Sequence, residues 1–141
     1  MGIALVPGFV KGTEPLFGGV RGGYPLDPWE LRTVYVVEAI PRHTTHPYGR
    51  KVFCFDQQTF APFYTFAYDQ QGKLWRTEFL RYANPDFYPG GKDVRVPILI
   101  GRSWLDYISN RVILNTVTGA VYNQPLPAEF FTKSNMIQKG H

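Results

Sequence analysis

The sequence predicts a mainly β protein built around an antiparallel sheet. Its length of 141 residues suits a single domain. It contains 14 glycines and 12 prolines, which are too many for a helical bundle and are typical of short strands separated by turns. Aromatic residues make up 16% of the chain and charged residues only 18%, a balance that excludes an intrinsically disordered protein.

Residues 1–29 are expected to form an extended, irregular arm. This stretch holds seven glycines and four prolines between large apolar side chains. Glycine and proline interrupt regular structure, so we predict neither a helix nor a regular strand here. The apolar content is too high for a free linker, and the arm should therefore lie against another part of the protein.

Residues 31–40 are predicted to form a strand. The segment is apolar on both faces and rich in β-branched residues, a pattern typical of a central strand that is covered on both sides. The polar, proline-containing residues 41–49 that follow are expected to form a loop.

A three-stranded antiparallel meander is predicted next. Two turns, Asp-Gln-Gln-Thr at 56–59 and Asp-Gln-Gln-Gly at 69–72, separate three apolar segments. Aspartate at the first position and glycine at the fourth favour a type I turn with Gly72 in the left-handed conformation. The predicted strands span residues 50–56, 60–69 and 73–82.

Further β structure is predicted after the meander. A loop over residues 83–92 precedes a strand over 93–102, in which Pro97 indicates an edge or a bulge. Residues 104–123 are expected to form one or two strands, with a short helical turn as the alternative for their first part.

The tail, residues 126–140, is the helical candidate. Pro127 suits the start of a helix and Gly140 suits its end, with apolar side chains between them.

Charge and cysteine content exclude several classes of function. The formal net charge is +4, but the basic residues form no run, so a nucleic-acid partner is not expected. The single cysteine, Cys54, excludes an intramolecular disulfide and a CxxC site, and its apolar strand predicts a buried, unreactive thiol.

Membrane insertion and secretion signals are not expected either. No apolar stretch reaches the roughly 18 residues that a membrane-spanning helix needs. The first residues do not match a signal peptide, because Pro7 and Gly8 interrupt the apolar stretch and no basic residue precedes it.

Catalysis finds no positive support in the residue pattern. His43 and His46 form an H-x-x-H pair in the predicted loop, but a metal site needs a third ligand, and none lies nearby in sequence. A Cys–His or Ser–His nucleophile pair remains open, although no nucleophile elbow, phosphate-binding glycine loop or paired-carboxylate motif is present. We therefore predict that the protein is not an enzyme and that it has no catalytic residues, metal or cofactor.

The aromatic side chains of the meander form the candidate ligand-binding face. Strict alternation places those of the first two strands on one face of each strand. The third strand adds Trp75 and Phe79 in one register; a shift by one residue adds Leu74 and Leu80 instead, and both registers remain open. Such a face is either an ordinary core or the wall of a cavity for hydrophobic ligands. The candidate residues are Phe53, Phe55, Tyr64, Phe66, Tyr68 and Trp75.

Residues 29–76 resemble the bacterial domain-of-unknown-function family 1329, whose members are often described as outer-membrane lipoprotein-sorting-protein-like. The matching motifs are W-E-x-R from Trp29, V-V-E-A at 36–39, H-P-Y-G-R at 46–50, a strand that ends in Asp56, and Y-D-x-x-G-x-L-W-R at 68–76. The tail with its Phe-Phe pair and late glycine is also similar to the end of the family, so the resemblance covers about two-thirds of the chain.

The resemblance implies a periplasmic or outer-membrane-associated protein. The implied fold is that of the lipoprotein carriers, a curved antiparallel sheet or incomplete barrel whose concave apolar face is covered by helices and holds acyl chains. No catalytic residue carries over from the family. The motif residues have a structural or a functional role, and Glu38 is expected to form a cross-strand pair with Arg50 or Arg76.

Family members are longer and begin with a signal sequence and an N-terminal half. This chain is therefore expected to be the C-terminal portion of a larger domain, with an arm over residues 1–29 and a β domain over 30–141. An isolated portion of this kind should form a homo-oligomer or pair with another chain, because its apolar face and sheet edge need cover.

Three hypotheses for function follow. The first is non-enzymatic binding of a lipid or other hydrophobic cargo in envelope transport, in which alanine at Phe66 and Tyr68 weakens cargo binding more than it weakens folding. The second is a structural or interaction module whose apolar face packs against another chain or a missing N-terminal half. The third is a hydrolase or metal enzyme that uses His43 and His46.

Overall fold

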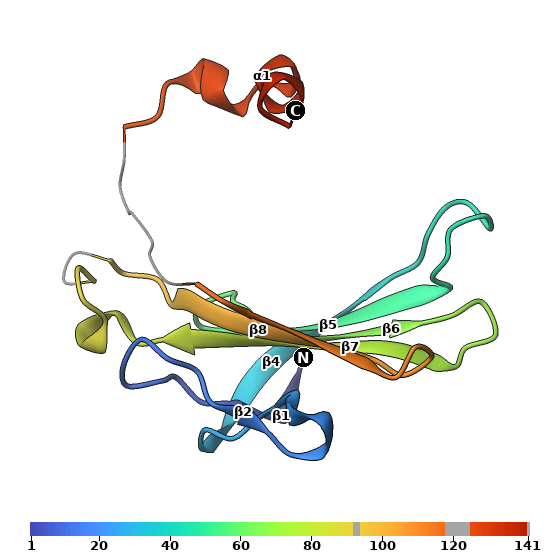
Figure 1. Ribbon diagram of the computed structural model, residues 1–141, viewed down its shortest axis with the longest axis horizontal. Helices are drawn as coiled ribbons and strands as arrows, with labels where there is room; N and C mark the ends of the chain where they lie inside the picture. The colour runs from blue at the N-terminus through green and yellow to red at the C-terminus, as the bar shows by residue number, and fades with distance from the viewer. Residues whose placement is uncertain (92–93, 118–124, 141) are drawn as a thin grey trace.

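One large antiparallel sheet dominates the computed structural model, which describes residues 1–91, 94–117 and 125–140 (Figure 1). Its seven strands follow the order β1-β4-β5-β6-β7-β8-β9, and the sheet does not close into a barrel. The predicted mainly β class is therefore confirmed. The strands are β1 (Gly2–Pro7), β4 (Trp29–Ala39), β5 (Arg50–Asp56), β6 (Pro62–Tyr68), β7 (Leu74–Ala83), β8 (Ile98–Asp106) and β9 (Arg111–Thr116).

The predicted meander is present as β5, β6 and β7. Each strand pairs with the next in antiparallel register. In the turn between β6 and β7, the Asp69 carboxylate accepts hydrogen bonds from the backbone amides of Gln71 and Lys73, at 3.0 and 2.8 Å. Gly72 has a φ of 80°, the left-handed conformation that the turn sequence predicts.

The N-terminal arm contains a strand that the sequence analysis did not predict. β1 pairs with β4 from Gly2 opposite Val34 to Pro7 opposite Trp29. Glycine and proline do not prevent this strand, because Pro7 stands at its last position, where the missing N–H is tolerated.

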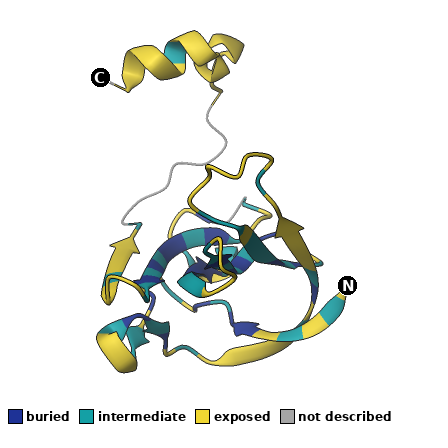
Figure 2. Cartoon of the chain, turned by 90° about the vertical axis from the view of Figure 1, so that its right-hand side faces the viewer, coloured by how far each residue is buried: buried dark blue, intermediate teal, exposed yellow. Residues whose placement is uncertain are grey.

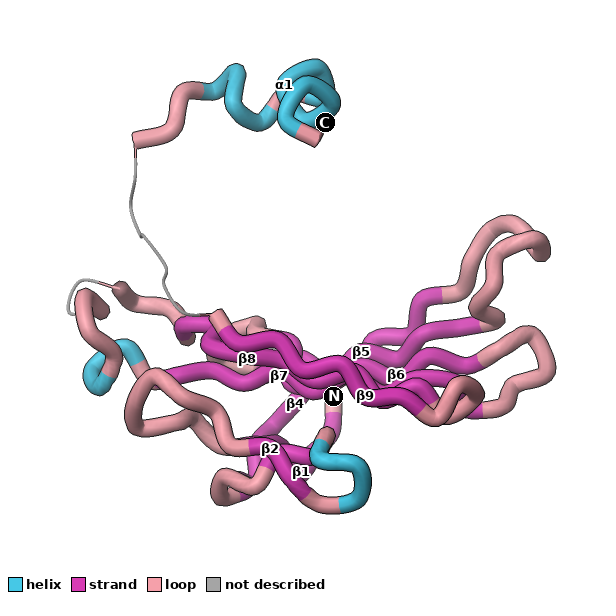
Figure 3. Tube along the Cα trace, viewed as in Figure 1, coloured by secondary structure: helices cyan, strands magenta, loops and turns pink. Residues whose placement is uncertain are grey.

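The rest of the arm packs under the sheet. It forms a two-stranded ribbon, β2 (Phe17–Gly18) and β3 (Tyr24–Pro25), with a 3₁₀ turn, η1 (Val20–Gly22), between them. This ribbon lies below the sheet in Figure 1 and, coloured by secondary structure, in Figure 3. The expectation that the apolar arm lies against the protein is therefore met.

β4 is not covered on both sides, contrary to its sequence pattern. Val34 is 1% exposed, but Val36 and Val37, which point to opposite faces, are 60% and 45% exposed. The reason is that the arm covers β7, β8 and β9 and leaves the outer part of β4 open. The sequence pattern correctly predicts a strand with two apolar faces. Among the described residues, however, no element covers both of these faces.

β8 begins later than predicted. It starts at Ile98, after Pro97, because proline has no N–H to contribute to the ladder. Residues 104–106 continue β8 instead of forming a separate element, and β9 follows after a turn. The predicted β residues 118–123, like residues 92 and 93 at the junction of loop and strand, lie outside the described residues.

The C-terminal helical prediction is confirmed. Residues 128–131 form a 3₁₀ turn, η3 (Ala128–Phe131), and the helix α1 (Lys133–Lys139) follows, away from the sheet in Figure 1. Thr132 caps α1, its hydroxyl accepting a hydrogen bond from the Asn135 amide at 3.3 Å, and Gly140 follows the last turn. Within the described residues, no helix has the length and apolar character needed to cross a membrane.

The core lies where the sheet curves over the arm, and Figure 2 shows buried residues gathered at the centre of the curved sheet. Cys54 is buried as predicted, and burial raises the pKa of its thiol, which keeps it protonated and unreactive. One apolar cluster consists of Val6, Val34, Cys54, Ala61, Phe63, Leu80 and Tyr82. A second consists of Val10, Ala83, Ile98 and Ile100.

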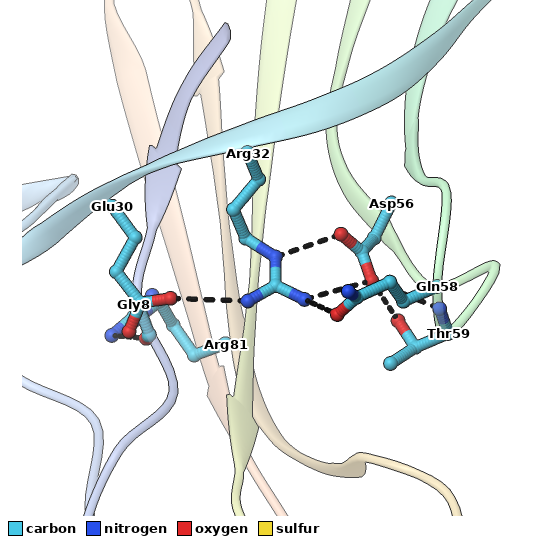
Figure 4. Close-up of polar contacts among 7 residues, drawn as sticks. All are labelled: Gly8, Glu30, Arg32, Asp56, Gln58, Thr59 and Arg81. Carbon is cyan, nitrogen blue, oxygen red and sulfur yellow. Dashed lines mark hydrogen bonds and ion pairs between the residues drawn. The ribbon is translucent and has the colours of Figure 1, made fainter. Parts of the chain in front are cut away.

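A buried ion pair holds the arm against the sheet. The side chain of Arg81 is 0% exposed, and its Nη2 lies 2.7 Å from Oδ2 of Asp27. The same nitrogen donates a hydrogen bond to the backbone oxygen of Gly8 at 3.0 Å (Figure 4). Further along, the hydroxyl of Ser103 donates to the backbone oxygen of Gly23 at 2.6 Å. The arm is thus fixed by polar contacts as well as by apolar packing.

A second ion pair anchors the turn between β5 and β6. Asp56 is 1% exposed and accepts hydrogen bonds from Arg32 Nε at 2.7 Å and from the Thr59 amide at 2.9 Å (Figure 4). The Thr59 hydroxyl donates to the same carboxylate at 2.7 Å, and Gln58 accepts a hydrogen bond from Arg32 Nη2 at 2.9 Å. This network ties β4 to the turn after β5.

Candidate functional site

Strand register divides the sheet into two faces, because residues directly opposite each other on neighbouring strands point to the same side. We call the face covered by the arm the lower face and the opposite one the open face. The ring of Tyr24, in the arm, packs on Phe79 of the lower face with ring centroids 5.7 Å apart. One row on the open face consists of Val37, Phe53, Thr65, Glu78, Trp104 and Ile113.

A second row on the open face, here called the charged row, lies beside the first. It consists of Lys51, Ala67, Arg76, Asp106 and Arg111. The two rows cross the sheet in parallel, two residues apart on each strand. The open face therefore presents a charged row next to a row that begins with apolar side chains.

The six candidate ligand-binding residues do not share one face. Phe53 lies opposite Thr65, whereas Tyr64 lies opposite Cys54 and Phe66 opposite Val52. The hairpin register pairs even-numbered residues of β5 with even-numbered residues of β6. Phe53 and Phe55 consequently lie on the open face. Tyr64, Phe66 and Tyr68 lie on the lower face.

The third strand follows neither predicted register in full. Phe79 lies opposite Tyr64 and joins the lower face. A bulge near Ala67 leaves Trp75 without a partner on β6. This bulge turns the indole toward the loop before β5, where its ring lies 4.8 Å from that of Tyr48. Trp75 therefore reaches the same end of the sheet as the charged row.

A partly exposed aromatic patch, in which Tyr35, Phe53 and Phe55 are half-buried, covers the part of the open face over β4 and β5. Phe53 and Phe55 stack with centroids 5.9 Å apart, and Tyr35 stacks on Phe60 at 6.0 Å. Phe60 is 68% exposed although it is one of the largest apolar residues. The aromatic patch consists of Tyr35, Val37, Phe53, Phe55 and Phe60. The sequence analysis missed Tyr35 and Phe60 because they become neighbours only through the pairing of β4 with β5.

Among the described residues, three connected hollows lie along the open face beside the patch. The central hollow, of about 70 Å³, is lined by Tyr48, Lys51, Thr65, Ala67, Arg76, Glu78 and Trp104. A hollow of about 480 Å³ continues toward β9 and is lined by Arg76, Trp104, Asp106, Ser109, Arg111 and Ile113. The third, of about 300 Å³, lies under the loop before β5 and is lined by residues 39–43, His46, Tyr48 and Lys51. Shared lining residues connect all three.

Two cations flank Tyr48 at the central hollow. Arg76 Nη1 donates a hydrogen bond to the Tyr48 hydroxyl at 2.8 Å, and Lys51 Nζ lies 4.4 Å from the centre of the Tyr48 ring. Arg76 Nε also donates to Asp106 at 2.7 Å. Burial by itself would raise the pKa of Asp106, but hydrogen bonds from Ser109 and Arg76 lower it to about 2. Asp106 is therefore ionised at neutral pH and holds Arg76 in place.

The two family motifs meet in space at this end of the sheet. The Gly49 amide donates to the Tyr68 oxygen at 2.9 Å. A Cβ at Gly49 would lie 2.5 Å from the backbone oxygen of Asp69, so only glycine fits there. Of the two pairs predicted for Glu38, the one with Arg50 forms, at 2.8 Å. These motif residues shape the loop and turn that carry Tyr48 and Trp75.

His43 and His46 both line the hollow under the loop. The His46 ring accepts a hydrogen bond from the Tyr48 amide at 3.2 Å and so stabilises the conformation of the loop. In residues 1–91, 94–117 and 125–140, no group of three His, Cys, Asp or Glu side chains is placed to hold a metal ion.

Glu78→Gln is expected to stabilise the protein at neutral pH. Burial raises the pKa of Glu78 above its ordinary 4.5, and Arg102 and Lys51 offset this only in part. A carboxyl whose pKa is higher in the folded chain destabilises the folded state when ionised, and this effect disappears below the unfolded pKa. Urea unfolding should show the variant more stable at pH 7 and the two proteins alike below about pH 4. Equal stability at both pH values would contradict the burial argument.

Comparison with known proteins gives two findings. A family model described as "Protein of unknown function (DUF1329)" matches residues 23–136. A solved domain from Vibrio parahaemolyticus, described as an outer membrane lipoprotein-sorting protein domain, is similar in fold with a TM-score of 0.57 at 17% sequence identity. The similarity covers 76% of this chain and 43% of that one, so this chain spans less than half the length of the similar domain. No curated protein matches the chain.

Proposed function

This chain belongs to the DUF1329 family of proteins of unknown function, and we propose that it binds a hydrophobic ligand, without catalysis, on the open face of its sheet. The observation that carries the proposal is the aromatic patch. It places stacked rings on a face with no cover among the described residues, beside connected hollows. Exposed apolar patches of this kind are typical of binding surfaces.

The fold supports a role in the bacterial envelope. The similar domain is described as an outer membrane lipoprotein-sorting protein domain. We propose a lipid or a related hydrophobic molecule as the ligand of this chain, and a periplasmic or outer-membrane-associated location. Binding would draw mainly on apolar area removed from water, at about 25 cal/mol per Å².

Phe53→Ala is expected to weaken binding of a dansyl-labelled fatty acid about tenfold, because one buried aromatic side chain contributes about 1.5–3 kcal/mol. Phe66→Ala is the matched control. Phe66 is half-buried on the neighbouring strand but lies on the lower face, so its loss should change binding less than about twofold. Fluorescence titration measures both, with urea unfolding to correct for stability. Equal weakening by the two variants would exclude the open face as the site.

A second candidate is an interaction module, and the exposure of β4 on both faces favours it. This chain also spans only 43% of the similar domain, so the open face could pack against a further part of the protein or another chain. Native mass spectrometry separates the two candidates. A bound lipid that denaturation releases supports ligand binding, whereas an oligomer without an adduct supports the interaction module.

A further inference from the structure

We propose that the ligand of the open face is a single-chain amphiphile with an anionic headgroup, which binds in the central hollow between Lys51 and Arg76 while its chain lies over the aromatic patch. The inference rests on the proposed function and specifies the chemical class of its ligand. Three observations support it: the charged side chains that line the hollows, the ion pairs that these side chains do or do not form, and the short distance between Lys51 and the aromatic patch.

The three hollows are lined by more positive than negative side chains of the two rows. Lys51, Arg76 and Arg111 line them, against the carboxylates of Glu78 and Asp106. Within the part of the chain that the structure describes, neither Lys51 nor Arg111 forms an ion pair, whereas Asp106 is already bound to Arg76. The central hollow itself is lined by two cations, Lys51 and Arg76, and by one carboxylate, Glu78, so an anion that enters it meets a net positive charge.

The central hollow offers donors for such an anion. Arg76 uses Nε for Asp106 and Nη1 for Tyr48, and among the described residues no group accepts a hydrogen bond from its Nη2. Lys51 Nζ lies over the Tyr48 ring, 4.4 Å from its centre. A volume of about 70 Å³ is about twice the volume of a water molecule and accommodates a small anionic group.

The aromatic patch begins two residues further along β5 from Lys51, which lines the central hollow. Lys51 and Phe53 point to the same face of β5, about 7 Å apart along the strand, and Phe55 follows at the same spacing. Val37 lies directly opposite Phe53 and widens the apolar surface. A headgroup held at Lys51 therefore directs an attached chain over the patch, and charge and apolar surface together select an amphiphile.

Glu78 allows a second test of the proposal, in which the expected change in affinity is opposite to that for Lys51. Its carboxyl lies in the central hollow, so its charge opposes an incoming anion. Lys51→Met should therefore weaken binding of an anionic amphiphile, whereas Glu78→Gln should strengthen it. Neither variant should change the binding of an uncharged amphiphile with the same chain, because only the headgroup meets these side chains.

The experiment compares laurate with monolaurin by isothermal titration calorimetry below their micellar concentrations. Lys51→Met should weaken laurate binding about tenfold and leave monolaurin unchanged, since one charge-assisted hydrogen bond is lost. Glu78→Gln should strengthen laurate binding severalfold, and Lys51→Arg should retain it. Lys73→Met, which removes a cation from the turn between β6 and β7, is the matched control.

The outcomes distinguish this inference from the proposed function. If laurate and monolaurin bind alike and Lys51→Met affects neither, the headgroup inference is wrong and ligand binding on the open face stands. If neither binds, both fail. Inorganic phosphate that binds as tightly as laurate would show a site for free anions, which overturns the amphiphile. Weaker laurate binding at higher salt, with monolaurin unaffected, would agree with the proposal.

Discussion

Asp27→Ala is expected to lower the free energy of unfolding by about 3–5 kcal/mol, the largest effect of any single substitution considered for this protein. Asp27 is the ion-pair partner of Arg81, whose side chain is 0% exposed. Burial lowers the pKa of Arg81 and Asp27 raises it again, so removal of Asp27 leaves a guanidinium that is both buried and unpaired. Urea unfolding measures the loss, and hydrogen exchange should show faster exchange at the Val10 amide.

The control for this prediction is Glu38→Ala. Glu38 also pairs with an arginine, Arg50, but its side chain is 44% exposed, and exposed pairs contribute at most about 1 kcal/mol. The double variant Asp27→Leu with Arg81→Met should recover much of the stability, because an apolar pair can replace a buried ion pair. A loss below about 1 kcal/mol for Asp27→Ala would show that packing alone holds the arm.

Asp56→Ala is expected to lower the free energy of unfolding by about 3 kcal/mol. This is the lower end of the range for breaking a buried ion pair, because the side chain of Arg32 is still 19% exposed. Burial by itself would raise the pKa of Asp56, but hydrogen bonds from Arg32 and Thr59 lower it below its ordinary value. A carboxylate of this kind contributes stability above its unfolded pKa of about 3.8, and the contribution is lost as the pH falls toward its folded pKa. The variant should therefore lose less stability than the natural sequence between pH 5 and pH 2.

Asp69→Ala is the matched control, because Asp69 begins the second Asp-Gln-Gln turn. Among the described residues, its carboxylate accepts hydrogen bonds only from two backbone amides and has no cationic partner. Its loss should cost about 1–2 kcal/mol. Equal costs for Asp56→Ala and Asp69→Ala would show that the turn matters and the pair with Arg32 does not.

The meander is the part of the fold that could be predicted best from the sequence. Its two turns contain residues whose local chemistry determines the backbone, above all Gly72, and such signals act over four residues. β1 was missed because the many glycines and prolines of residues 8–28 suggested an irregular arm throughout. The six residues of β1 carry no turn signal before Pro7.

The candidate site could be predicted only in part, because its assembly depends on register. Phe53 and Phe66 have similar sequence surroundings, yet one lies on the open face and the other on the lower face. A shift by one residue in the turn after Asp56 would place Phe66 on the same face as Phe53. The contact between Tyr48 and Arg76 could not be predicted from the sequence either, because 28 positions separate the two residues and only the folded loop brings them together.

The contact of the arm with β7 also has a consequence for folding during synthesis. Val10 forms a parallel bridge with Ala83, and its amide bonds to the Tyr82 oxygen at 2.8 Å. Residues 8–28 leave the ribosome before their partner strand, which becomes available only after residue 83 has emerged. Contacts so distant in sequence slow folding. The nascent arm, with its apolar side chains exposed, is thus the segment for which a chaperone would have the longest opportunity to bind.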